Sequence, residues 1–153
     1  MSATSLEVFD RTLHTTNTWL DQIMRDLGPD RKLAWHALGA VLHALRDRVP
    51  LGLPIHLGTQ LPLLVRGLYY DQWRPSENPP RFRSADEFLA YVQKGLTGIR
   101  PVNAEAAAQA VLRVINHYVD PTEVEKMRNS LPERIQALWP ENNATMGRAH
   151  SVA

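Results

Sequence analysis

The chain has 153 residues, of which 44% are hydrophobic and 22% charged, and it contains no cysteine. This length suits one domain, or two small halves that share a core. The lack of cysteine excludes disulfides, thiolate catalysis and cysteine-ligated zinc. The formal net charge is only +1, whereas nucleic-acid binders usually concentrate positive charge on one face.

The beginning of the chain carries no targeting signal that we can identify. Residues 1–5 are short and polar, without the basic and apolar regions of a signal peptide. No apolar run approaches the ~20 residues that span a bilayer. We therefore expect a cytoplasmic protein without a membrane segment.

The first part of the sequence predicts two long helices. A Thr4–Glu7 capping box is expected to open the first helix, and Gly28-Pro29 to end it. Asp30 is the expected cap of the second helix, which Pro50 ends. Apolar residues recur at three- and four-residue steps along both helices, which indicates one buried stripe on each. The stripe of the first helix is formed by Leu6, Phe9, Leu13, Leu20, Ile23 and Leu27.

A proline interrupts the next apolar stretch. Within a helix over residues 54–71, Pro62 would cost ~3 kcal/mol, so we expect a break near Gln60 and two short helices. Ser130–Glu133 has capping-box spacing and predicts a similar start later in the chain. Residues 74–83 hold three prolines and no period, and we interpret them as a linker.

The second half repeats these signals. Capping residues predict helix starts at Ser84, Asn103 and Asp120, the last followed by proline in the first turn. Short helices are expected at about 121–129 and 131–139. Residues 141–153 show no core pattern, and we interpret them as a mobile tail.

The two halves are similar to each other. Residues 34–69 align with residues 104–139 without a gap, and nine of the 36 positions are identical, including the Leu-Pro at both breaks. We predict an all-α fold built from two tandem helical repeats, each a helix, a second helix and a Pro-broken helix, packed into one bundle. The predicted organisation is a first repeat over 1–73, the linker 74–83, a second repeat over 84–140 and the tail 141–153.

Several motifs are distinctive enough to indicate a family. They are Val41-Leu-His-Ala-Leu-Arg-Asp-Arg-Val49, Gln60-Leu-Pro62, Arg66-Gly-Leu-Tyr-Tyr70, Trp73-x-Pro75, Leu131-Pro132 and Leu138-Trp-Pro140. With these motifs, residues 5–140 resemble the bacterial "domain of unknown function 2267" family. The resemblance implies a small all-helical bacterial protein and brings no activity, cofactor or catalytic residue.

The candidate binding residues are those that differ between the repeats. Arg66, Tyr70 and Trp73 stand close together in the first repeat only, and such residues dominate protein interfaces. We expect Arg66 and Tyr70, one helical turn apart, to share a face. The alternative is a structural role, with Tyr69 and Trp73 half-buried under the Arg66 stem.

Other chemistries find little support in the sequence. His36 and His43 share a helix face, but a metal site needs more ligands, and a His43–Asp47 pair is more plausibly a surface hydrogen bond. No nucleophile motif or phosphate loop occurs, so we expect no catalytic residue, metal or cofactor. Nucleic acid is not an expected partner, although five arginines could gather in space: Arg46, Arg48, Arg81, Arg83 and Arg100.

The leading hypothesis is therefore a non-enzymatic interaction protein that binds another protein or a second copy of itself through Arg66, Tyr70 and Trp73. One alternative is a carrier of a small apolar ligand, with a pocket between the two repeats. The other is an enzyme too divergent to recognise.

Overall fold

Eight helices form the regular structure of residues 3–47, 49, 52–75, 82 and 84–140, which are those that the computed structural model describes. No strand occurs among these residues, so the predicted all-α class is confirmed. In chain order the helices are α1 (Glu7–Leu27), α2 (Arg31–Asp47), α3 (Gly52–Thr59), α4 (Leu63–Tyr70), α5 (Ala85–Gly95), α6 (Ala104–Tyr118), α7 (Pro121–Asn129) and α8 (Glu133–Gln136).

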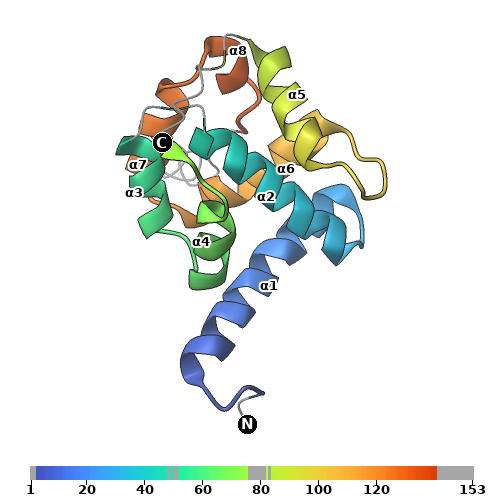
Figure 1. Ribbon diagram of the computed structural model, residues 1–153, viewed down its shortest axis with the longest axis vertical. Helices are drawn as coiled ribbons and strands as arrows, with labels where there is room; N and C mark the ends of the chain where they lie inside the picture. The colour runs from blue at the N-terminus through green and yellow to red at the C-terminus, as the bar shows by residue number, and fades with distance from the viewer. Residues whose placement is uncertain (1–2, 48, 50–51, 76–81, 83, 141–153) are drawn as a thin grey trace, which may run out of the picture.

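Helix α2 lies at the centre of the bundle, in contact with α1, α4, α5 and α6 (Figure 1). Its apolar residues are almost all buried, and they meet those of α6 and of the C-terminal half of α1 in one core. Helix α3 packs against α7, so the first helices of the two Pro-broken segments lie side by side (Figure 1). The N-terminal half of α1 projects from the bundle. Over the described ranges, no helix combines the length and apolar character needed to cross a bilayer.

Side-chain caps fix most of the predicted helix starts. Asp30 accepts a hydrogen bond from the Leu33 amide at 3.0 Å, and Asn103 accepts one from the Ala106 amide at 2.9 Å. Ser84 and Asp120 cap α5 and α7 in the same way. Each cap satisfies an amide that has no partner within its own helix, so these starts could be recognised from sequence.

Two predicted capping boxes are wrong. Helix α1 begins at Glu7, because the Thr4 hydroxyl instead bonds the Asp10 carboxylate at 2.8 Å across a turn. The Ser130 hydroxyl donates back to the Met127 carbonyl at 2.6 Å and ends α7 rather than opening α8. Helix α8 is also shorter than predicted, because bonds between residues three apart tighten the chain after Gln136.

The predicted proline breaks are confirmed. Pro62 and Pro132 each precede a short helix as its N-cap, with φ/ψ of −55°/150° and −53°/147°. The burial pattern over residues 60–70 is also the same, position by position, as that over residues 130–140. These features agree with the predicted duplication, which itself stays a prediction, as do the predicted repeat boundaries. Most of the predicted linker 74–83 and the whole tail 141–153 lie outside the described residues.

Two glycines predict opposite effects of adding a methyl group. At Gly95 a Cβ would lie 2.7 Å from the Ala40 Cβ, where α5 crosses α2, whereas at exposed Gly67 nothing lies within 4 Å. We expect Gly95→Ala to lower the free energy of unfolding by about 1–3 kcal/mol through overpacking. Gly67→Ala, the matched control within a helix, should raise it by about 0.5–1 kcal/mol. Urea unfolding measures both, and effects of the same sign would contradict this account of the crossing.

Candidate functional site

The three predicted binding residues meet around Gly58, near the end of α3. Arg66 donates hydrogen bonds to the carbonyls of Gly58 and of two residues that follow it, at 2.9–3.2 Å. The ring of Tyr70 covers Gly58 so closely that a Cβ there would lie 2.0 Å from the tyrosine oxygen. Trp73 stacks on Tyr70 with ring centroids 5.6 Å apart. We call Gly58, Arg66, Tyr70 and Trp73 the Gly58 clasp.

The clasp has a clear structural role. Carbonyls at the end of a helix lack partners within it, and the Arg66 guanidinium satisfies two in the last turn of α3 and one just after it. Trp73 is half-buried, as the structural alternative expected. Tyr69 is completely buried rather than half-buried, and its hydroxyl donates to the Pro54 carbonyl at 2.6 Å. Whether the clasp also binds a partner stays a prediction.

A buried arginine lies beside the clasp. Arg46 is only 6% exposed, although it belonged to the set of arginines considered for nucleic acid. Its guanidinium donates to the Tyr69 and Asp71 carbonyls at 2.8 and 2.9 Å, and to the Asp47 carboxylate at 2.6 Å. The Tyr91 hydroxyl of α5 donates to the same carboxylate. Arg46 and Asp47 thus connect α2 both to the chain that leaves α4 and to the second half.

His43 contacts a different partner from the one expected. Its Nε2 lies 2.7 Å from the Leu68 carbonyl oxygen, so the predicted surface bond to Asp47 is wrong. A carbonyl only accepts hydrogen bonds, and Nε2 must therefore carry the proton. Burial lowers the pKa of His43 below its usual 6.5, more than the Leu68 bond raises it. Among the described residues, no three His, Asp or Glu side chains gather as a metal site would require.

The second half contains comparable contacts at an offset of 70 residues. Asn116, at the position that corresponds to Arg46, is also buried and donates to the Pro140 carbonyl at 2.6 Å. Gln136, which corresponds to Arg66, donates to the Leu131 carbonyl at 2.8 Å. No Gly58 clasp forms here, because Pro140 stands where the first half has Tyr70.

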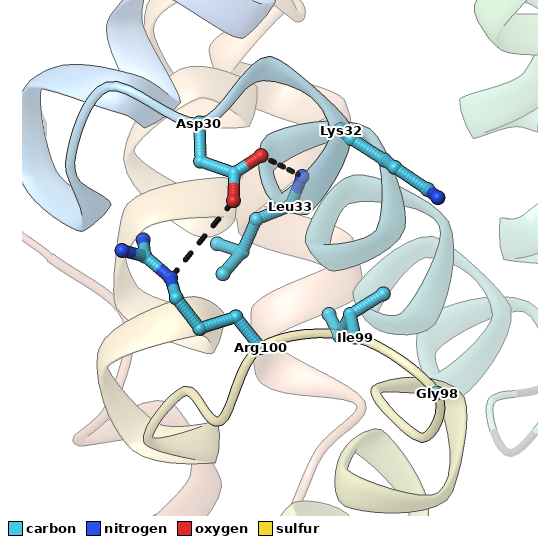
Figure 2. A pocket seen from close by; sticks show the side chains of 6 residues that line it. All are labelled: Asp30, Lys32, Leu33, Gly98, Ile99 and Arg100. Carbon is cyan, nitrogen blue, oxygen red and sulfur yellow. Dashed lines mark hydrogen bonds and ion pairs between the residues drawn. The ribbon is translucent and has the colours of Figure 1, made fainter.

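Figure 2 shows a small pocket between the start of α2 and the segment that connects α5 to α6. Its volume is about 220 Å³, below the ~300–1,000 Å³ typical of ligand sites. The Asp30 carboxylate caps α2 and lies 3.9 Å from the Arg100 Nε, whereas Lys32 points away. This pocket joins residues of the two halves, but its acidic group is already engaged by the protein.

A second pocket, of about 310 Å³, lies between α6, α7 and the residues after α8. The Nε of Arg128 is buried and has no hydrogen-bond partner. The pocket is lined by Asn116, Pro121, Val124, Glu125, Arg128, Asn129, Trp139 and Pro140.

The most apolar exposed surface lies on α1 and α4. Large apolar side chains on both helices are 40–53% exposed. The Leu64 amide of α4 donates to the Thr12 hydroxyl of α1 at 3.0 Å, so the apolar side chains of the two helices adjoin. The predicted core stripe of α1 is thus buried only from Thr16 onward, because the bundle ends there. We call this surface the α1–α4 apolar face, and its residues are Leu6, Phe9, Leu13, Leu63 and Leu64.

One family model matches the chain. It describes an uncharacterized conserved protein, DUF2267, and it covers residues 16–138. No curated protein matches the sequence.

The lowered pKa of His43 predicts how stability changes with pH. The unfolded chain binds a proton near pH 6.5, whereas the folded protein resists protonation until lower pH. The free energy of unfolding should therefore fall as the pH drops below about 6.5 toward the folded pKa. His43→Gln should weaken this dependence, whereas His14→Gln on the exposed part of α1 should preserve it. Urea unfolding at several pH values between 7.5 and 5 tests the prediction, which equal slopes in both variants would contradict.

Proposed function

The chain belongs to the family of uncharacterized conserved proteins DUF2267, and we propose that it is a non-enzymatic interaction module that binds a second copy of itself. The observation that carries the proposal is the α1–α4 apolar face, where five large apolar side chains are at least 40% exposed on adjoining helices. Contiguous apolar surface of this kind marks interaction sites in monomers.

The projecting half of α1 supports a helical partner. Leu6, Phe9 and Leu13 follow at steps of three and four residues, the spacing by which paired helices pack along a seam. A helical segment this short is marginal in water without packing on its apolar side. A partner helix laid along the stripe supplies that packing.

A second copy fits this stripe because it offers the same stripe. Two identical surfaces related by a two-fold axis form a self-complementary interface, the commonest arrangement in soluble oligomers. Glu7 and Arg11 already pair with each other at 2.6 Å on the exposed side of α1, so neither charge needs a partner from the other copy. Leu63 and Leu64 of α4 extend the apolar surface beside the stripe.

The Gly58 clasp supports the same surface. Arg66 fixes the junction between α3 and α4 and thereby holds Leu63 and Leu64 at the start of α4. Tyr70 and Trp73, the binding residues predicted from the sequence, lie at the other end of this short helix and outside the proposed dimer interface. We further propose that the protein acts in the cytoplasm.

Self-association predicts a mass that depends on the stripe. We expect light scattering after gel filtration to give twice 17.3 kDa for the wild type. Phe9→Glu/Leu13→Glu should give the monomer mass, because it places two charges in the seam. The control Val8→Glu/Arg11→Gln changes the charge equally but lies beside the stripe, and it should remain dimeric.

The other outcomes distinguish the two surfaces. A monomeric wild type, or a dimeric Phe9→Glu/Leu13→Glu variant, would contradict the proposal. The clasp variant Tyr70→Ala/Trp73→Ala should remain dimeric. If the clasp variant is monomeric while Phe9→Glu/Leu13→Glu is still dimeric, the interface is assigned to the clasp instead.

A further inference from the structure

The exposed stripe of α1 continues the stripe that the same helix buries in the bundle. Leu6, Phe9 and Leu13 are exposed. Further along the same stripe, Leu20 and Ile23 are buried in the core, where α1 packs on α6 and α2. One face of a helix keeps nearly one direction along its axis. A partner helix that covers the exposed stripe therefore lies in line with the helices that cover the buried part.

This position decides the direction of the second copy's α1. If that helix ran parallel to the first α1, its C-terminal half would continue along Leu20 and Ile23 and occupy the space of α6 and α2. An antiparallel α1 meets no such obstacle, because its C-terminal half and its bundle extend past the N-terminal end of the first α1. Phe9 of each copy then lies opposite Leu13 of the other, and Leu6 reaches the level of Thr16.

The turn before α1 leaves room for the bundle of the second copy. Ser5 has a φ of 62°, in the left-handed region that residues other than glycine rarely adopt. The Thr4 amide and hydroxyl both donate to the Asp10 carboxylate, at 3.2 and 2.8 Å. The chain therefore turns aside at the start of α1 instead of continuing along the helix axis (Figure 1), which is where an antiparallel partner places its bundle.

Leu63 and Leu64 of α4 widen the apolar face at the end nearer to the bundle. The bond between the Leu64 amide and the Thr12 hydroxyl places them beside this part of α1, and thus across from Leu6 and Phe9 of an antiparallel partner. If a large apolar side chain buries ~150 Å², the five half-exposed side chains offer on the order of 400 Å² per copy. This is close to the apolar share of a standard interface of ~800 Å² per partner. The α1 stripe alone falls short of it, so a stable dimer also covers α4.

We propose that the two copies pair in an antiparallel, reciprocal way, in which the projecting half of each α1 packs below the bundle of the other copy, against its α1 stripe and its α4. This inference rests on the self-association proposed above and adds which elements of the second copy form the interface. Each copy thereby extends the apolar layer that the other bundle leaves open beyond Thr16.

Distances between spin labels test the direction of pairing. The chain has no cysteine, so one engineered cysteine carries one label per copy, and pulsed electron paramagnetic resonance measures the separation. For Arg25→Cys, on the exposed side near the end of α1, antiparallel pairing predicts at least about 40 Å from the helical rise of ~1.5 Å per residue. Parallel pairing predicts about 20–30 Å. The control Arg11→Cys lies near the two-fold axis and should give about 20–30 Å in either arrangement.

The outcomes separate this inference from self-association itself. A short distance at both positions would overturn the antiparallel arrangement and leave the dimer in place. If Arg11→Cys gives no measurable distance and the protein has the monomer mass, both proposals are wrong.

A second variant tests the contact with α4. Leu63→Ser/Leu64→Ser should weaken dimerisation at least tenfold in analytical ultracentrifugation, because it removes apolar surface that the second copy covers. The control Ile55→Ser removes a side chain of α3 that is 46% exposed and lies outside the α1–α4 apolar face, so it should leave the affinity unchanged. Circular dichroism shows whether each variant is folded. Unchanged dimerisation of a folded Leu63→Ser/Leu64→Ser protein would refute the contact with α4.

Discussion

The buried guanidinium of Arg46 is the contact on which the arrangement of the first half depends. It reaches from the end of the central helix to carbonyls 23 and 25 residues later, so it fixes where the chain runs after α4. Asp47 balances its charge and also accepts a hydrogen bond from Tyr91 of the second half. Loss of one partner of such a buried pair leaves an uncompensated charge in the core, which is strongly destabilising.

The same end of the core helix in the second half carries a neutral group. Asn116 bonds one carbonyl and the Trp139 indole, so the path of the chain after α8 is held without any buried charge. Apart from these corresponding contacts at the ends of α2 and α6, the two halves differ in a few side chains. Gly58 and Tyr70 pack on each other in the first half, whereas the second half has Arg128 and Pro140 at these positions, beside a pocket. Differences between otherwise similar halves are where a specific function is expected.

Two surface features thus follow from one architecture. The bundle buries α1 only as far as its neighbours reach, and the N-terminal half of α1 projects beyond it (Figure 1). The apolar side chains of that half are therefore exposed. On the other Pro-broken segment, a short helix and a proline frame the pocket at Arg128.

The sequence by itself determined the helical class, the caps at Asp30, Ser84, Asn103 and Asp120, and the breaks at Pro62 and Pro132, because caps, prolines and apolar periods act over a few neighbouring residues. It placed the apolar residues of α1 on one stripe but could not show that the bundle stops at Thr16. Only the tertiary structure decided that Arg46 is buried, that His43 meets Leu68, and that Arg128 faces a pocket. The partners of these side chains lie 20 or more residues away in the sequence or on separate helices. The spacing of neighbouring residues does not encode contacts over such separations.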